Sequence, residues 1–160
     1  MITGKTRYYA ILGDPIEQAL SPVVHNAAFE ALGMDAVMLG CRVTPEELKK
    51  AVEGTRALHF EGLAVTMPHK TAIIPLLDEW EEKIDFLGAV NVVTCKNGDY
   101  KGYNTDGDGF VQNMKQNGTD PAGIRVFLLG AGGAARGLGY ALLESAVSSQ
   151  TVCIIDEPLG

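Results

Sequence analysis

The chain has 160 residues, 46% of them hydrophobic, and a formal net charge of −7 at pH 7. This size and apolar content suit one hydrophobic core, or one domain and the start of a second. The acidic pI of about 4.9 and the lack of a Lys/Arg cluster argue against a nucleic-acid partner. Residues 1–6 carry no apolar signal core and no apolar run is long enough to span a membrane, so we expect a cytoplasmic protein. The three cysteines have no metal-ligand spacing, which predicts neither a disulfide framework nor a metal site.

The first part of the chain alternates between short apolar runs and helical patterns. The runs predict strands at residues 8–12, 37–43 and 62–66, and a hairpin across Asn97-Gly98 that joins residues 90–95 to 100–103. The helical patterns predict a helix at 24–32, capped by Ser21 and ended by Gly33, one from a capping box at 44–47 through Val52, and one at 68–77. A loop or helix then closes this unit.

A second pattern follows a polar, turn-rich stretch at residues 117–121. It predicts a strand at 126–129, a glycine-rich turn at 130–135, a helix at 134–143 and a strand at 152–155. This is one βαβ unit. We therefore expect a first domain over residues 1–121 and the start of a second over residues 122–160.

The glycine-rich turn is the first candidate binding site. It matches the G-x-G-x-x-[G/A] pattern between a strand and a helix, with Asp156 after the next strand. Glycines let a pyrophosphate approach the backbone closely, and the N–H groups of a helix N-terminus attract it. The pattern predicts dinucleotide binding, with Asp156 at a ribose. A plain tight turn, and an Asp156 that merely forms a turn, are the alternatives. The residues expected at the cofactor are Gly130, Ala131, Gly132, Gly133, Ala134 and Asp156.

Two further segments combine polar residues with turns. Lys70 lies just after a strand end, at the start of a helix whose dipole repels it, so helix stability does not explain its place. An ordinary solvated lysine is the alternative. The polar turn at 102–107 follows the hairpin, and an Asx turn or helix cap is its alternative explanation.

Taken in order, these segments resemble the shikimate dehydrogenase family. The resemblance rests on the motifs Gly13-Asp14-Pro15-Ile16, Leu20-Ser21-Pro22 with His25-Asn26, Val65-Thr66-Met67-Pro68-His69-Lys70, Gly88-Ala89-Val90-Asn91, Gly102-Tyr103-Asn104-Thr105-Asp106-Gly107 and Gly130-Ala131-Gly132-Gly133-Ala134. It implies an α/β fold: an N-terminal three-layer substrate-binding domain with a mixed, mostly parallel sheet, followed by the start of a Rossmann fold.

The resemblance also implies an activity. The family interconverts shikimate and 3-dehydroshikimate reversibly with a nicotinamide cofactor, usually NADP, in aromatic amino-acid biosynthesis and without a metal. The partners would be a small-molecule substrate and cofactor, in a monomer or homodimer. Lys70 would be the acid/base and Asp106 its hydrogen-bonded partner at the substrate, which Ser21, Thr66 and Asn91 would also bind. Ser21 would then serve both as helix cap and as carboxylate ligand.

The chain departs from the family pattern in its substrate motifs. Ala19 stands where the usual Ser-x-Ser has its first serine, so one hydrogen bond to the substrate carboxylate is lost. Such a bond to a charged group is worth about 1.5–3 kcal/mol. Gln18 and Ala64 change the expected pocket further. A quinate-accepting paralogue is therefore the alternative to a shikimate dehydrogenase.

The last residues also depart from the pattern. Asp156-Glu157-Pro158 stands where NADP-using members carry an Asn-Arg-Thr type sequence, and carboxylates repel a ribose phosphate, so we lean towards NAD over NADP. The sequence stops at Gly160 after one strand-helix-strand unit. A dinucleotide-binding domain is built from two halves, each with the pattern βαβαβ. We therefore expect a truncated Rossmann domain, and a fragment that binds shikimate-like acids without turnover is a further alternative.

Overall fold

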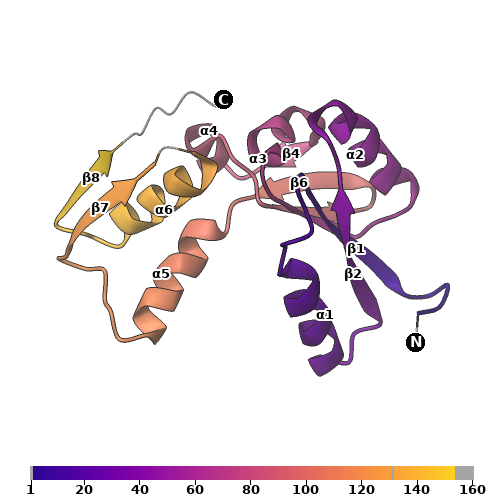
Figure 1. The fold of residues 1–160 in the computed structure, drawn as a ribbon, viewed down its shortest axis with the longest axis horizontal. Coiled ribbons are helices and arrows are strands. Elements are labelled where there is room, and N and C mark those ends of the chain that lie inside the picture. The colour runs from indigo at the N-terminus through magenta and orange to yellow at the C-terminus, as the bar shows by residue number, and fades with distance from the viewer. Residues whose placement is uncertain (1, 131, 154–160) are drawn as a thin grey trace. The chain divides into compact units, whose positions relative to one another are not determined.

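The computed structural model describes residues 2–130 and 132–153, and the chain divides into two compact units (Figure 1). The first unit comprises Met1–Glu82 and Val90–Tyr103, and the second comprises Lys83–Ala89 and Asn104–Gly160.

A mixed six-stranded sheet forms the centre of the first unit. Its strand order is β2-β1-β3-β5-β6-β4. The pairs β1–β2, β1–β3 and β4–β6 are parallel, and only β5 runs antiparallel to its neighbours β3 and β6. This confirms the expected mixed, mostly parallel sheet. The strands are β1 (Arg7–Gly13), β2 (Ala36–Arg42), β3 (Gly62–Val65), β4 (Glu79–Trp80), β5 (Val92–Lys96) and β6 (Asp99–Tyr103).

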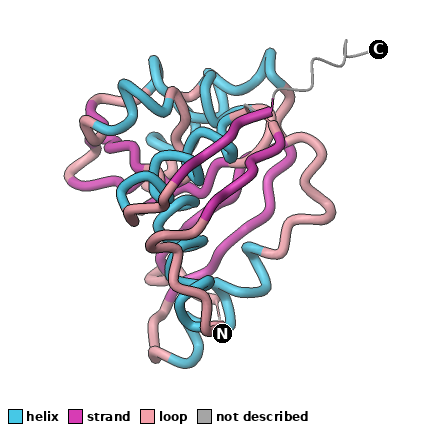
Figure 2. Tube along the Cα trace, turned by 90° about the vertical axis from the view of Figure 1, so that its left-hand side faces the viewer, coloured by secondary structure: helices cyan, strands magenta, loops and turns pink. Residues whose placement is uncertain are grey.

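Helices cover both faces of this sheet, which makes three layers. Figure 1 shows α1 on one side of the strands and α2 and α3 on the other, and Figure 2 shows helices, in cyan, beside the strands, in magenta. Ala10, Ile11 and Leu12 in β1 are all at most 4% exposed, because successive residues of a strand point to opposite faces and both faces are covered. The helical segments are α1 (Ser21–Ala31), a 3-10 turn at Pro45–Glu47, α2 (Leu48–Ala57), α3 (His69–Ala72) and a 3-10 turn at Ile74–Leu76.

The local signals of the first unit are largely confirmed. Gly33 ends α1 with a left-handed φ of 64°, and its N–H donates to the Glu30 carbonyl. Asn97 and Gly98 both have positive φ, as the turn between β5 and β6 requires. Ser21, however, is not the cap of α1. The helix begins at Ser21, its N-cap is Leu20, and no side chain caps it.

Two helix predictions need correction. The helix expected at 68–77 stops at Ala72 and gives way to a 3-10 turn, because Pro75 has no N–H to continue it. The capping box at 44–47 does not form. Thr44 donates to the Glu47 carboxylate at 3.2 Å, a 3-10 turn follows, and α2 continues to Ala57 rather than ending at Val52.

A cluster around Arg56 ties α2 to the β4–β6 edge of the sheet. The guanidinium lies 4.2 Å above the Tyr100 ring and donates to the Asp78 carboxylate and to the Gly98 carbonyl, both at 2.8 Å. The Tyr100 N–H donates to the same carboxylate at 2.6 Å. The pKa of the Asp78 carboxyl is lowered from its ordinary value, first by the bond from the Tyr100 backbone and then by Arg56. The charged form of Asp78 therefore stabilises the folded state.

Replacing Arg56 with alanine is expected to lower the free energy of unfolding by about 1–3 kcal/mol, because a cation over an aromatic ring and hydrogen bonds to charged groups are lost together. Since the lowered pKa of Asp78 gives stability that disappears as pH falls through that pKa, the variant should also lose less stability in acid than the parent. Urea unfolding at neutral and acidic pH measures both. Arg7→Ala is the matched control, because its 3.4 Å pair with Glu61 is exposed and worth about 0–1 kcal/mol. Equal losses in the two variants would contradict the prediction.

The second unit contains the predicted βαβ pattern and two further helices. β7 and β8 are parallel neighbours, with Arg125 opposite Ser149 and Leu129 opposite Cys153. β8 therefore begins before the predicted strand at 152–155, whose last two residues lie outside the described chain. Within the described residues, no helix has the length and hydropathy to cross a bilayer. The elements are α4 (Lys83–Leu87), α5 (Asp106–Gln116), β7 (Arg125–Leu129), α6 (Gly133–Glu144) and β8 (Ser149–Cys153).

Helix α5 groups with α6 rather than with the first unit. A Cβ on Gly107 would overlap the Gly137 carbonyl oxygen and would lie 2.7 Å from the Ala141 Cβ, so the two helices touch where neither carries a large side chain. The compact second unit therefore begins well before the composition change at 117–121. The division into domains 1–121 and 122–160 stays a prediction.

Candidate functional site

Two parallel strands end side by side at one edge of the first unit's sheet. Leu12 of β1 lies opposite Val65 of β3. Beyond them, the Thr66 N–H donates to the Leu12 carbonyl and the Asp14 N–H donates to the Met67 carbonyl, both at 3.0 Å. The loop after β1 and the loop after β3 therefore run together. Such carboxyl ends of parallel strands are where open α/β sheets bind ligands.

Gly13 lets these loops approach each other. A Cβ at this position would overlap the Thr66 Cγ2 atom and would lie 3.2 Å from the Met67 carbonyl oxygen. Only glycine fits without moving Thr66, so the close approach explains the glycine at the end of β1.

Replacing Gly13 with alanine is expected to displace Thr66 and to lower the free energy of unfolding by about 1–3 kcal/mol through overpacking. Urea unfolding measures the loss, and the NMR chemical shift of the Thr66 amide reports the displacement. Gly54→Ala in α2 is the matched control, because no described atom outside its own helix backbone lies within 4 Å of its Cβ position. An unchanged Thr66 amide in Gly13→Ala would contradict the prediction.

Backbone hydrogen bonds bring Lys70 and Asn91 to the same edge as Thr66. The Val65 N–H donates to the Asn91 carbonyl, and the Val90 N–H donates to the Lys70 carbonyl, both at 2.8 Å. All three predicted site residues are half-buried. The edge therefore gathers residues that carry a hydroxyl, an amide and an amino group, a set suited to an oxygen-rich anion.

His69 anchors the short helix that carries Lys70. Its side chain is fully buried, and Nε2 lies 2.7 Å from the Val43 carbonyl oxygen, so Nε2 carries the proton and donates it. Its own N–H donates to the Thr66 carbonyl at 2.9 Å. Sequence reasoning gave His69 no role of its own. Its position beside Lys70, on the inward side of a four-residue helix, was the only signal.

Ser21 begins α1, after the loop that leaves β1. It is half-buried, and its hydroxyl makes no hydrogen bond to another residue in the described part of the chain. The helix-cap explanation is therefore wrong, and the hydroxyl is available for a ligand. The Asp14 carboxylate of the preceding loop accepts a hydrogen bond from Arg42 Nε at 2.8 Å, which ties this loop to the end of β2.

Asp106 lies in the second unit, whereas Lys70 lies in the first. Asp106 is the half-buried first residue of α5, and its N–H donates to Asn104 Oδ1 at 3.1 Å. The polar turn at 102–107 thus contains an Asx turn, as its alternative explanation anticipated. The pairing of Lys70 with Asp106 stays a prediction.

The glycine-rich turn joins β7 to α6. Gly130 has a φ of 111°, which favours glycine, and among the described residues no atom beyond the chain neighbours lies within 4 Å of the Cβ positions of Gly130 and Gly132. Gly132 is the N-cap of α6 and has no side chain that could cap this end. Open space beside uncapped N–H groups fits a phosphate. Ala131 and Asp156 lie outside the described residues, and the remaining predicted residues, Gly133 and Ala134, open the helix.

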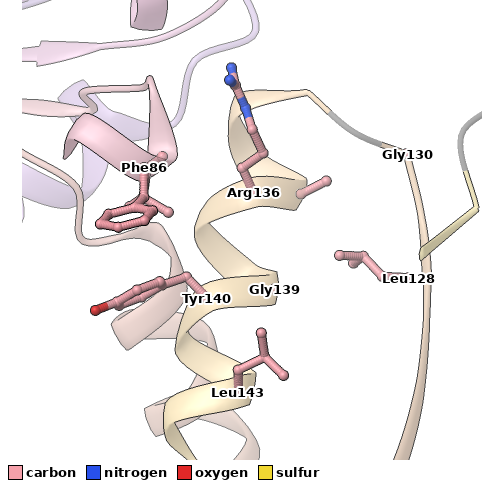
Figure 3. A pocket seen from close by; sticks show the side chains of 9 residues that line it. Phe86, Leu128, Gly130, Arg136, Gly139, Tyr140 and Leu143 are labelled. Carbon is pink, nitrogen blue, oxygen red and sulfur yellow. The ribbon is translucent and has the colours of Figure 1, made fainter. Parts of the chain in front are cut away.

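An apolar pocket of about 280 Å³ lies beside this turn (Figure 3). Phe86, Leu128 and Tyr140 are among the described residues that line it, and Arg136 is the only charged one of these. Its walls suit apolar groups rather than phosphates. Among residues 2–130 and 132–153, no three His, Cys, Asp or Glu side chains gather to hold a metal ion.

Comparisons with known proteins agree with this geometry. The family model described as "Shikimate dehydrogenase substrate binding domain" matches residues 11–93. The "Shikimate dehydrogenase (NADP(+))" of Geobacter metallireducens is 51% identical over 136 residues, covering 84% of this chain and 48% of that protein. The chain spans about half the length of the curated relatives it matches.

Solved structures share the fold. Shikimate 5-dehydrogenase from Listeria monocytogenes, solved with shikimate and NAD, has a TM-score of 0.90 and 36% identity, covering 98% of this chain and 54% of that one. The 5-ketofructose reductase of a Gluconobacter strain has a TM-score of 0.85 and 33% identity, covering 94% of this chain and 54% of that one. The same fold thus occurs in proteins named for different substrates.

Proposed function

The chain belongs to the shikimate dehydrogenase family, and on that premise we propose that it takes part in the reversible oxidation of shikimate to 3-dehydroshikimate with a nicotinamide cofactor. The observation that carries the proposal is the gathering of Thr66, Lys70 and Asn91 at the carboxyl edge of the sheet. This reaction belongs to aromatic amino-acid biosynthesis. A cytoplasmic location, small-molecule partners and a monomeric or homodimeric state are part of the same proposal.

Lys70 is the proposed acid/base. In the oxidation direction, the carbon–hydrogen bond of the alcohol breaks and its electron pair leaves with the hydrogen as a hydride. The hydroxyl oxygen on that carbon loses its proton as the carbonyl double bond forms. Lys70 takes that proton in its neutral form and returns it in the reverse reaction, which requires hydrogen-bond reach to the hydroxyl oxygen. Asp106 is its proposed partner at the substrate. A bound nicotinamide dinucleotide supplies the hydride acceptor.

Ser21, Thr66 and Asn91 are proposed to hold the substrate. Their hydroxyl and amide groups match the hydroxyl and carboxylate groups of shikimate-like acids. The Ser21 hydroxyl supports this, since it caps no helix. Ala19 favours a second candidate, a quinate-accepting paralogue, because a missing serine removes one carboxylate ligand of the shikimate pattern.

The cofactor is proposed to lie with its pyrophosphate at the β7–α6 turn. The open Cβ positions of Gly130 and Gly132 and the uncapped start of α6 support this place. The choice between NAD and NADP depends on Asp156 and Glu157, outside the described residues. Their carboxylates favour NAD, whereas the names of the curated relatives carry NADP(+).

NAD is therefore expected to bind more tightly than NADP, because Asp156 accepts hydrogen bonds from ribose hydroxyls and repels a ribose phosphate. Calorimetric titration of the chain with each cofactor measures the preference. Asp156→Asn removes the charge and should narrow the difference. Tighter binding of NADP by the unaltered chain would contradict the prediction.

Turnover tests the proposed function. The chain is mixed with shikimate or quinate and with NAD or NADP, and the absorbance of the reduced cofactor is followed. We expect reduction with at least one pair, and the preferred acid decides between the shikimate and quinate candidates. Binding of shikimate with no reduction of either cofactor would instead favour the alternative that the chain binds shikimate-like acids without turnover.

A further inference from the structure

We propose that Asn104 is a positioning residue that holds the Asp106 end of α5 in place. This inference rests on the proposed function, because it assumes that Asp106 meets the substrate. It adds a residue that touches neither substrate nor cofactor and acts through Asp106.

Both polar atoms of the Asn104 side-chain amide make hydrogen bonds. The side chain is 2% exposed, Nδ2 donates to the Ala89 carbonyl at 2.9 Å, and Oδ1 accepts the Asp106 N–H at 3.1 Å. The orientation of the amide follows from these partners, since a carbonyl oxygen accepts and an N–H donates. A carboxylate could not donate to Ala89, and an apolar side chain could make neither bond. Only an amide of this length satisfies both.

Asn104 also contacts α6. A Cβ on Gly137 would lie 3.1 Å from Asn104 Oδ1, so the side chain lies directly against the helix that follows the glycine-rich turn. One buried amide therefore touches three elements of the second unit: the segment after α4, the start of α5, and α6. The Lys83–Asp108 ion pair, at 3.0 Å, also joins α4 to α5, but Asp108 is 67% exposed and such pairs contribute little.

These contacts fix where α5 begins. Asp106 is its first residue, and a frayed first turn would move the carboxylate first. Sites that bind and orient a substrate lose function when a contacting group is displaced by about 1 Å. Asn104 should therefore influence shikimate binding although the proposed substrate ligands do not include it.

A double-mutant cycle on the 160-residue chain tests this. Shikimate affinity is measured by calorimetry for the parent, Asn104→Ala, Asp106→Ala and the double variant. We expect Asn104→Ala to weaken binding by about tenfold, in line with the loss of the bonds that hold Asp106. We expect no further loss when Asp106 is already alanine, because Asn104 acts through it. A general structural role would instead weaken binding equally in both backgrounds and would overturn the inference.

A second variant tests the same role in case Asn104→Ala does not fold. In Gly137→Ala, the new Cβ on α6 would lie 3.1 Å from Asn104 Oδ1 and would displace the Asn104 side chain. We expect this variant to retain the fold and to bind shikimate about two- to fivefold more weakly. Gly109→Ala in α5, with no atom within 4 Å of its Cβ position, is the control and should bind as the parent does.

The outcomes separate the two proposals. If the parent does not bind shikimate, or if Asp106→Ala binds as tightly as the parent, the proposed function fails and the inference fails with it. If Asp106→Ala weakens binding while neither Asn104→Ala nor Gly137→Ala does, only the positioning role of Asn104 is overturned.

Discussion

Replacing Lys70 with alanine is expected to lower shikimate turnover by about 10²- to 10⁴-fold, the usual contribution of a general acid/base. Cofactor affinity should remain nearly unchanged, because Lys70, on α3, is not among the residues proposed to bind the cofactor. Turnover is measured in the chain as above, by the absorbance of the reduced cofactor with shikimate.

Lys50→Ala serves as the control for that measurement. Lys50 is an exposed lysine of α2, so its loss removes the same charge without touching the site. The control should turn over shikimate at the parental rate. A Lys70→Ala variant with a normal rate would remove Lys70 from the proposed chemistry.

Replacing Gly107 with alanine is expected to lower the free energy of unfolding by about 3 kcal/mol, at the upper end of overpacking costs. The new Cβ would overlap the Gly137 carbonyl oxygen, and a backbone atom cannot rotate away as a side chain can. Helix propensity alone predicts the opposite sign, a gain of up to about 1 kcal/mol for Gly→Ala inside a helix. The sign of the measured change therefore shows whether the tertiary contact or the helix propensity has the larger effect at this position.

Urea unfolding, followed by hydrogen exchange at the amides of α5 and α6, measures this loss in the unit where it arises. Gly109→Ala in the same helix has open space at its Cβ position and should show the propensity gain instead. Equal stability of the two variants would show that α5 and α6 do not pack as closely as the structure has them.

Features with short-range causes were predictable from the sequence. Gly33 ends a helix and Asn97-Gly98 closes a hairpin because each conformation needs positive φ, which these residues tolerate. The strand patterns located six strands within a residue or two. The α/β class and the mixed sheet followed from the family resemblance.

Features with long-range causes were not predictable. β4 has two residues and α4 has five, too few for a periodic pattern. The grouping of α5 with α6 depends on Gly107 meeting Gly137, thirty residues later in the chain. The side chains of Asn104 and His69 are likewise held by hydrogen bonds to carbonyl groups distant in sequence. No local sequence pattern predicts these bonds. In the candidate site, the motifs named Thr66, Lys70 and Asn91, but only the backbone hydrogen bonds between distant segments show why these residues meet.

The central claim is that the carboxyl edge of the first sheet binds a shikimate-like acid, and an NMR titration of the 160-residue chain with shikimate tests it most directly. We predict saturable shifts of the amides of Thr66, Lys70 and Asn91, with a weaker affinity in Thr66→Val, which keeps the shape of the side chain and removes its hydroxyl. Shifts confined to other parts of the chain, or an affinity unchanged in Thr66→Val, would contradict it.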